Sequence, residues 1–206
     1  MYDCMIEWKM MMLKILRSCW SYSSRDIENF FRNKANLMET ALEQILMNSY
    51  KDGMISYMNA HPEDFEESIK LALSDKQSYS WRAAWLLWSC MKENDPRIQP
   101  FIKSIINVLT SKNDDHQREL LKILLQMELN EKQESFLFDV CMSVWEQINK
   151  KPSVRFTAFK FIVKIVKKHP DLSHEIIYLI QNQYMDSLSP AAKKSIHKMI
   201  KEFIKQ

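Results

Sequence analysis

Glycine occurs only once in this chain of 206 residues, at Gly53, whereas ordinary proteins contain roughly 7 % glycine. Phosphate-binding loops and dinucleotide-binding folds depend on clustered glycines, because their backbone turns at positive φ or approaches the ligand closely. The tight turns of β-hairpins also rely on glycine. The sequence therefore excludes nucleotide-binding folds of these classes, argues against a mainly β protein and predicts an all-α fold.

Five of the six prolines stand where segments with helical apolar periodicity begin. Proline is tolerated in the first helical turn, where its missing N–H would have no partner, and it is excluded from helix interiors. These five prolines are Pro62, Pro96, Pro152, Pro170 and Pro190. The predicted helices span residues 62–74, 78–92, 97–110, 114–128, 131–149, 152–168, 171–184 and 190–205. Taken in pairs, these segments predict four helix hairpins.

The N-terminal part of the sequence is less regular. Residues 1–23 are rich in methionine, and we expect them to form an irregular segment ahead of a single domain over residues 24–206. Ser24 is a good N-cap for an amphipathic helix whose apolar positions continue to Leu46. A weaker helix is expected over residues 50–58, interrupted or bent at Gly53.

A basic residue returns at nearly constant spacing along the predicted hairpins. Arg82, Arg118, Arg155 and Lys193 open the second helix of successive hairpins and are separated by 36, 37 and 38 residues. At three, six and seven residues after each of them the sequence is apolar, with Ser89 as the one exception. This period lies between the roughly 34 residues of tetratricopeptide repeats and the roughly 40–47 of HEAT and armadillo repeats. The chain is therefore predicted to be an array of helical repeats.

Two segments resemble the second helix of a HEAT repeat. Residues 151–163, Lys-Pro-Ser-Val-Arg-Phe-Thr-Ala-Phe-Lys-Phe-Ile-Val, have valine and arginine at the start and a small residue, Ala158, to face the partner helix. Residues 80–87, Ser-Trp-Arg-Ala-Ala-Trp-Leu-Leu, resemble the same unit, and the glycine and tyrosine positions of tetratricopeptide repeats are missing. The resemblance covers about residues 60–206. It implies a right-handed α–α superhelix, a HEAT-like (armadillo-type) solenoid of about four helix hairpins plus N-terminal helices.

The order of these segments is also similar to that of small bacterial HEAT-like proteins sometimes labelled adenylosuccinate lyase. The lyase itself is a much longer helical enzyme with a catalytic loop that is rich in serine and glycine and carries a Met-Pro-x-Lys-x-Asn pattern. No segment of this sequence matches that loop. No catalytic residue is therefore transferred, and we do not expect the chain to be an enzyme.

Histidines and cysteines form no ligand or nucleophile pattern in the sequence. There is no HExxH motif, and Cys4, Cys19, Cys90 and Cys141 show no CxxC spacing, so neither a metal site nor a cofactor is expected. The wide spacing of the four cysteines is typical of reduced thiols. No uncharged stretch approaches the roughly 20 residues needed to cross a bilayer, and no signal-peptide pattern is evident. We therefore expect a soluble, cytoplasmic protein without membrane association.

Trp81, Trp85 and Trp88 are the most unusual cluster in the sequence. Their spacing places three indoles along one stripe of a helix. Core packing is one interpretation of this stripe. The other is an aromatic anchor site for a partner peptide, because tryptophan is enriched at interaction hot spots and its N–H needs a polar partner when buried.

The repeated basic residues also have two interpretations. Arginine at a helix N-terminus opposes the helix dipole, which indicates that each arginine has a specific partner. The arginines could pair with acidic residues between repeats, for which Asp75, Asp114 and Asp115 are available, or they could line an anion-binding groove. The candidate partner-binding residues are Trp81, Arg82, Trp85, Arg118, Arg155 and Lys193.

Two functions follow from these patterns. Stacked repeats present an extended concave surface without any catalytic group, so we expect a monomeric, non-catalytic scaffold or adaptor that binds a protein or peptide. The alternative is a nucleic-acid-binding protein, related in build to HEAT-like DNA alkylation repair glycosylases. Residues 150–206 carry 12 Lys and Arg against 4 Asp and Glu, whereas the rest of the chain carries 17 against 22. The basic C-terminal helices are therefore the part that would bind phosphates.

Overall fold

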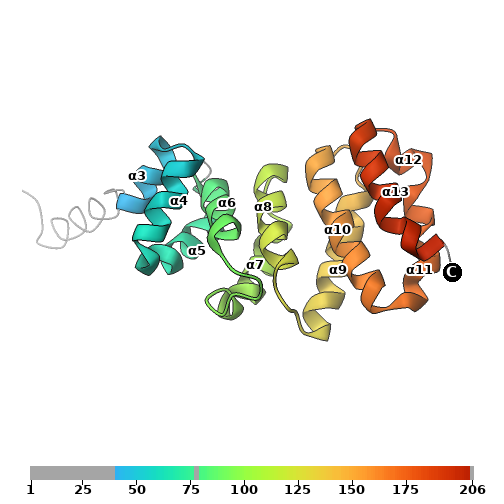
Figure 1. Cartoon of the computed structure of the whole chain (residues 1–206), viewed down its shortest axis with the longest axis horizontal. Helices are drawn as coiled ribbons and strands as arrows, with labels where there is room; N and C mark the ends of the chain where they lie inside the picture. The colour runs from blue at the N-terminus through green and yellow to red at the C-terminus, as the bar shows by residue number, and fades with distance from the viewer. Residues whose placement is uncertain (1–39, 77–78, 205–206) are drawn as a thin grey trace, which may run out of the picture. The chain divides into compact units, whose positions relative to one another are not determined.

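Figure 1 shows the computed structural model of the chain, which describes residues 40–76 and 79–204. The chain divides into two compact units, residues 1–41 and 42–206. Only Thr40 and Ala41 of the first unit are among the described residues, so the packing below is that of the second unit. The expected irregular segment over residues 1–23, the domain start at Ser24 and most of the helix predicted up to Leu46 fall outside the described residues.

Helices dominate the described part of the chain, and none of its residues lies in a β-strand. The α-helices are α3 (Ala41–Asn48), α4 (Lys51–Ala60), α5 (Phe65–Leu73), α6 (Ser80–Cys90), α7 (Ile102–Leu109), α8 (Asp114–Leu125), α9 (Glu131–Glu146), α10 (Pro152–Lys168), α11 (Ser173–Ile176), α12 (Asn182–Met185) and α13 (Pro190–Ile204). Short 3-10 turns are η1 (Pro62–Asp64), η2 (Gln99–Phe101), η3 (Pro170–Leu172) and η4 (Tyr178–Ile180). The prediction of an all-α protein is confirmed.

From α5 onward the helices pack as hairpins in two layers. α5 packs against α6, α7 against α8, and α9 against α10. The second helices also contact one another in chain order, α6 with α8, α8 with α10, and α10 with α13, and the first helices do the same from α5 to α9 (Figure 1). We call α5, α7 and α9 the A layer, and α6, α8, α10 and α13 the B layer. This repeated stacking makes the fold an α-solenoid, as predicted.

The apolar residues that recur at helical spacing form a continuous core between the two layers. Leu86 and Leu87 of α6 are at most 1 % exposed, and Ala158 of α10 is fully buried. The ring of Phe159 packs against that of Trp145 in α9, with centroids 4.6 Å apart. Burial of each large apolar side chain contributes roughly 1.5–3 kcal/mol. The core therefore holds neighbouring helices together and places the remaining faces of the B-layer helices at the surface.

Four of the five prolines predicted to open helices do so, and the fifth is a correction. Pro62, Pro152, Pro170 and Pro190 each stand in the first turn of a helix. The helix expected directly after Pro96 instead begins at Gln99 and has Pro100 in its first turn.

The loop before η2 explains this displacement. The Asp95 carboxylate accepts hydrogen bonds from the backbone N–H groups of Lys92 and Arg97, at 3.2 and 3.0 Å. Asn94 adopts a positive φ of 50°, which asparagine tolerates better than most residues. These local bonds stabilise a turn at the point where the helix was expected to start.

The helix predicted over residues 171–184 is also wrong, because this segment consists of η3, α11, η4 and α12. Side chains of α9 and α10 donate hydrogen bonds to backbone carbonyls of this segment. Trp145 donates its Nε1–H to the Leu179 carbonyl at 2.9 Å, and Arg155 donates an Nη2–H to the Tyr184 carbonyl at 2.6 Å. Gln181 between them is extended, with φ −63° and ψ 154°. Tertiary hydrogen bonds thus replace part of the helical ladder that the sequence pattern predicted.

The expected break at Gly53 is not observed. α4 runs without interruption from Lys51 to Ala60, and Gly53 lies in its first turn without a positive φ. Glycine costs at most about 1 kcal/mol relative to alanine in a helix. That cost is too small to break a helix whose Met54 and Met58 are buried in the core.

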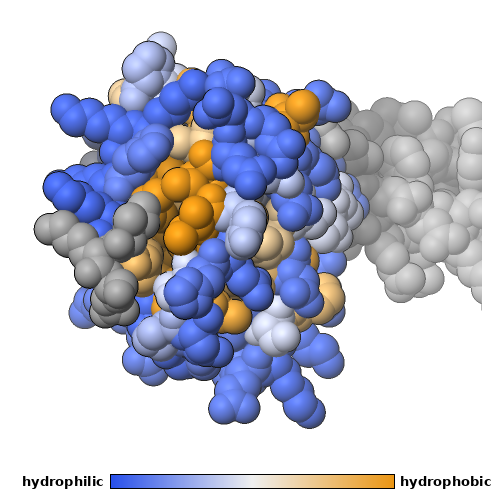
Figure 2. Space-filling model, turned by 90° about the vertical axis from the view of Figure 1, so that its right-hand side faces the viewer, coloured by the Kyte–Doolittle hydropathy of each residue, from blue (hydrophilic) through white to orange (hydrophobic). Residues whose placement is uncertain are grey.

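Figure 2 looks onto the side of the molecule where α11–α13 lie in Figure 1, and it shows apolar side chains gathered within a polar rim. In this part of the chain Ile177 is 45 % and Tyr178 is 66 % exposed. The last hairpin therefore leaves part of its apolar surface uncovered.

Candidate functional site

The three tryptophans of α6 are neither fully buried nor fully exposed. Trp81, Trp85 and Trp88 are each half-buried. Trp85 and Trp88 pack against the core, and their rings meet edge to face with centroids 6.2 Å apart and an interplanar angle of 80°. α6 therefore anchors two indoles in the core by one edge and leaves part of each ring at the surface of the B layer.

Cationic side chains lie against these aromatic rings. The Nζ atom of Lys51 is 5.3 Å from the centroid of Trp85, and that of Lys122 is 4.3 Å from the centroid of Trp88. The same pairing recurs in α10, where the Nζ atom of Lys160 is 4.9 Å from the ring of Phe156. Cations within about 6 Å of an aromatic centroid are attracted by the ring quadrupole. Lysines of α4, α8 and α10 therefore lie against aromatic rings of α6 and α10. We call the surface formed by Trp85, Trp88 and Phe156 with Lys51, Lys122 and Lys160 the aromatic–cationic face.

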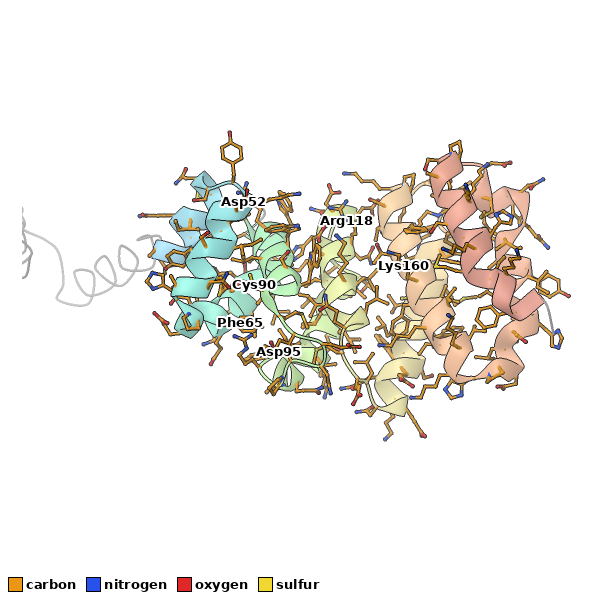
Figure 3. All side chains as sticks on the ribbon, in the orientation of Figure 1. Asp52, Phe65, Cys90, Asp95, Arg118 and Lys160 are labelled. Atoms are coloured by element: carbon orange, nitrogen blue, oxygen red, sulfur yellow. The ribbon has the colours of Figure 1, made fainter. Side chains whose placement is uncertain are left out.

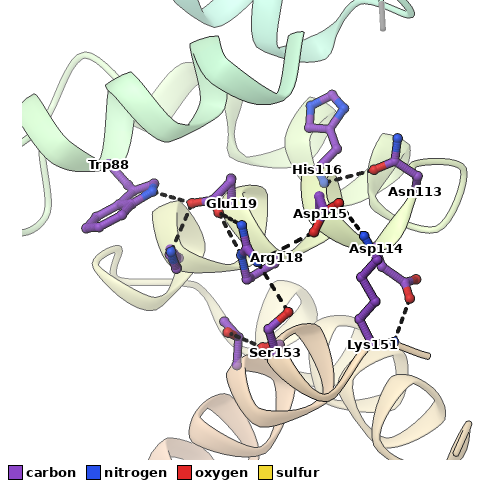
Figure 4. A network of polar contacts seen from close by, with 11 residues as sticks. Trp88, Asn113, Asp114, Asp115, His116, Arg118, Glu119, Lys151 and Ser153 are labelled. Atoms are coloured by element: carbon purple, nitrogen blue, oxygen red, sulfur yellow. Dashed lines mark hydrogen bonds and ion pairs between the residues drawn. The ribbon is translucent and has the colours of Figure 1, made fainter. Parts of the chain in front are cut away.

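A buried carboxylate holds part of this face in place (Figure 4). Glu119 in α8 has no exposed surface, yet it accepts hydrogen bonds from Trp88 Nε1 at 2.5 Å, Arg118 Nε at 2.7 Å and Lys122 Nζ at 3.0 Å. Arg118 also donates an Nη1–H to Ser153 Oγ in α10 at 3.2 Å. A buried charge is stable only when it is paired and hydrogen-bonded. Glu119 therefore fixes the indole of Trp88 and links α6 to α8, while Arg118 continues the link to α10.

Arg155 occupies the equivalent register position in α10 and is fully buried. Its Nε–H is donated to the Trp145 carbonyl at 2.9 Å, and its two terminal nitrogens donate to Ser187 Oγ at 2.5 Å and to the Tyr184 carbonyl at 2.6 Å. The guanidinium thus joins α9, α10 and the segment before α13. It has no surface that a partner could contact in this conformation.

Lys193, in α13, is the last of the four regularly spaced basic residues. Its side chain is 35 % exposed, and its Nζ atom lies 3.5 Å from Asp186 Oδ1. This ion pair spans the loop ahead of α13 and is remote in the chain from the tryptophans. Figure 3 shows that Arg118 and Lys160, by contrast, lie on the neighbouring helices α8 and α10. Among the described residues, Arg118 is linked to α6 through Glu119 and Trp88. No described contact joins Lys193 to the candidates on α6 or α8.

Arg82 differs from the other arginines of the register. Its Nη2 atom donates to the Ser49 carbonyl and lies 3.6 Å from Met54 Sδ. Its Nε atom is buried and has no hydrogen-bond partner. Within residues 40–76 and 79–204, no carboxylate lies within ion-pair distance of it. Arg82 lines a cavity of about 190 Å³ whose other lining residues are Tyr50, Lys51, Met54, Trp81 and Trp85.

The three acids that were expected to pair with the arginines are all bound by lysines, and Asp115 also forms the expected kind of ion pair, with Arg118 at 3.5 Å. Each lysine precedes or begins a second helix and reaches back to the preceding repeat. The pairs are Lys112 with Asp75 at 2.6 Å, Lys150 with Asp114 at 2.8 Å, and Lys151 with Asp115 at 2.5 Å. Hydrogen bonding to Lys112 lowers the pKa of the Asp75 carboxyl. The signal that could have found these lysines is their spacing of 36 or 37 residues from the acids, which matches the repeat.

The titratable groups of the described part do not resemble a catalytic centre. Burial raises the pKa of the thiols of Cys90 and Cys141, so both stay protonated at neutral pH. His116 is buried beside the Ala72 carbonyl, with its Nε2 atom 2.7 Å from that oxygen, and burial lowers its pKa. Across residues 40–76 and 79–204, no three His, Cys, Asp or Glu side chains come together as metal ligands would. The groups that converge on the aromatic–cationic face are suited to binding.

None of the described helices combines the length and the apolar character that crossing a membrane requires.

Comparison with known protein families gives one match for this chain. The model of a family described as HEAT repeat domain matches residues 38–203. No curated protein and no solved structure matches the chain.

Proposed function

The chain belongs to the HEAT repeat domain family, and we propose that it is a non-catalytic scaffold whose aromatic–cationic face binds a segment of a partner protein. The match over residues 38–203 confirms the resemblance inferred from the sequence. Repeat stacks of this kind create continuous surfaces from neighbouring helices and are widely used for recognition. The family alone supports a scaffold, and the choice of surface rests on the geometry of α6, α8 and α10.

The observation that carries this proposal is the set of half-buried rings on that surface. Trp85, Trp88 and Phe156 are anchored in the core yet partly exposed, and each has a lysine within 5.3 Å of its ring. Tryptophan, tyrosine and arginine are enriched at binding hot spots, and tryptophan offers a large, rigid contact area at a low entropic cost. Rigid aromatic side chains flanked by cations would suit a partner segment with apolar and acidic residues.

Nucleic-acid binding through α13 is the second candidate. Lys194, Lys198 and Lys201 are exposed on this helix. The aromatic–cationic face itself favours protein over nucleic acid, because Arg118 and Lys122 are already bound to Glu119 and few cations remain for phosphates. Phosphate binding by α13 would weaken steeply with salt.

Affinity capture with two matched charge-reversal variants tests the proposal. Lys51→Glu/Lys160→Glu reverses two exposed lysines of the aromatic–cationic face, and Lys103→Glu/Lys132→Glu reverses two exposed lysines of the A layer. We expect a stoichiometric partner that the native chain and the A-layer variant retain and the first variant loses. If every captured protein binds all three chains equally, the proposed surface is wrong. Loss of bound DNA or RNA from Lys194→Glu/Lys198→Glu alone would support the second candidate instead.

The expectations of a cytoplasmic location and of a monomer remain predictions. Gel filtration coupled to light scattering tests the second of them.

A further inference from the structure

We propose that the cavity beside Arg82 receives an acidic side chain of the bound partner segment. We call this cavity, lined by Tyr50, Lys51, Met54, Trp81, Arg82 and Trp85, the Arg82 pocket. The inference rests on the proposed function and goes beyond it, because it assigns the chemistry of the residue that the scaffold selects.

The first argument is that Arg82 is bonded differently from the other two regularly spaced arginines. Arg118 is bound to the Glu119 carboxylate, with its Nη2 atom 2.6 Å from Oε1. The three donor nitrogens of Arg155 all have acceptors. Arg82 uses only its Nη2 atom, toward a carbonyl and a thioether sulfur, and its Nε–H is shielded from water without an acceptor. Among the described residues no carboxylate pairs with Arg82, and its Nη1 atom makes no hydrogen bond, so an anion that enters the cavity would complete the bonding of the guanidinium.

The second argument is the composition of the pocket wall. The rings of Trp81 and Trp85 and the side chain of Met54 give it apolar sides, and Lys51 adds a second cation that is exposed at the surface. Tyr50 is 92 % exposed and adds a further aromatic group to the lining. Such a wall can hold the methylene groups of an acidic side chain while the two cations bind its carboxylate.

The third argument is size. The pocket holds about 190 Å³, whereas sites for drug-sized ligands and cofactors usually hold about 300–1,000 Å³. The volume therefore suits one or two side chains of a peptide. The lining ends at Trp85, whose ring meets that of Trp88 edge to face, so neighbouring residues of the same segment can lie on the aromatic–cationic face.

A peptide fits the charge of the pocket better than a nucleic acid does. Lys51 and Arg82 are the only cations among the described residues that line the Arg82 pocket. Nucleic-acid binding normally neutralises many phosphates, and each one steepens the salt dependence of binding. Two cations match a single carboxylate, and the affinity for such a ligand should depend only weakly on salt concentration.

Selection from a library of random displayed peptides on the full chain, followed by a mutant cycle, tests this inference. We expect the selected peptides to contain Asp or Glu beside apolar residues. Replacing that acid by its amide should weaken binding to the native chain by about tenfold or more, as for a charged hydrogen bond. Binding to Arg82→Gln should be weaker and its preference for acid over amide much smaller than in the native chain, because only Lys51 still faces the carboxylate. Lys132→Gln in the A layer should behave as the native chain does.

Each other result has a defined meaning. Equal binding of acid and amide peptides by the native chain, or an acid preference in Arg82→Gln as large as that of the native chain, would overturn the inference. In either case the scaffold function survives if Lys51→Glu/Lys160→Glu still abolishes binding of the selected peptides. If that double variant also binds normally, the proposed face fails as well. Displacement of the peptides by a single-stranded oligonucleotide, with a steep salt dependence, would assign the pocket to phosphate.

Thermal unfolding shows whether Arg82→Gln is folded. Should it be unfolded, Arg82→Lys replaces it in the cycle. Lysine keeps the charge and lacks the planar fork of arginine, so we expect a smaller preference for acid over amide than in the native chain. An unchanged preference would overturn the role of Arg82.

Discussion

The indole of Trp88 in α6 donates its Nε1–H to the carboxylate of Glu119 in α8 at 2.5 Å, although Glu119 has no exposed surface. The bond crosses from one repeat to the next and fixes one of the half-exposed rings of the aromatic–cationic face. The same carboxylate is bound by Arg118 and Lys122. Glu119 therefore contributes both to the order of the proposed binding surface and to the cohesion of adjacent repeats.

Glu119→Gln should destabilise the fold measurably. The amide keeps the shape of the side chain and loses the charge that binds two cations, so we expect a loss of about 1–3 kcal/mol in the free energy of unfolding. Urea unfolding followed by circular dichroism measures this loss. Glu131→Gln, at an exposed position of α9, is the matched control and should change stability by less than about 0.5 kcal/mol. Equal stability of the two variants would contradict the role given to Glu119.

Arg155→Met should be more damaging. The substitution leaves the buried carbonyls of Trp145 and Tyr184 without their donors, and each unsatisfied group costs about 1–3 kcal/mol. Lys160→Met, at an exposed position of the same helix, provides the control. Hydrogen exchange should show the segment from Leu172 to Leu188 losing protection first in Arg155→Met. Protection equal to that of the native chain would show that Arg155 does not hold this segment.

His116 should make stability depend on pH in the mildly acidic range. Burial lowers its pKa below the ordinary value of 6.5, so the folded chain binds this proton less readily than the unfolded chain does. Its contribution is therefore fully present above pH 6.5 and declines as the pH falls below that value. Unfolding free energies measured between about pH 7.5 and 5 should show a shallower decline for His116→Gln than for the native chain. His174→Gln, at an exposed position, should keep the native slope, and an identical slope in both variants would refute the assignment.

Asp95 should make stability depend on pH in a more acidic range than His116 does. Hydrogen bonding to Arg97 lowers its pKa from 3.8 to about 2, so its ionised form stabilises the folded chain. That contribution is complete above the ordinary pKa of 3.8 and is lost as the pH falls toward 2. With Arg97 partly exposed, we expect Asp95→Asn to cost about 1–2 kcal/mol at neutral pH and the difference to shrink in acid. Urea unfolding at several pH values checks both parts, and a difference that does not change with pH would contradict the ionic role.

The sequence predicts this fold where local pattern and tertiary packing agree. The helix predicted over residues 152–168 coincides with α10, because a proline opens it and a dense apolar pattern continues to its end. The helix predicted over residues 171–184 failed because Trp145 and Arg155, far away in sequence, bind its carbonyls. Hydrogen bonds of this kind have no local signature.

The candidate site was predictable only in part. The spacing of Trp81, Trp85 and Trp88 placed them on one helix stripe, and the structure shows each of them half-buried. Sequence periodicity treated Arg82 and Arg155 as equivalent, yet Arg155 is fully buried and Arg82 lines a pocket. Their difference arises from the elements around each arginine, which the repeat spacing does not encode.

Photo-crosslinking from two phenylalanines tests the proposed binding surface most directly. Phe156 lies on the aromatic–cationic face, and Phe136 lies in the A layer with 51 % of its surface exposed. Each is replaced in turn by p-benzoylphenylalanine, and the full chain is irradiated with the partner found by affinity capture. We expect the partner to crosslink from position 156 and not from position 136. Crosslinking from position 136 alone, or equally from both, would contradict binding at this face.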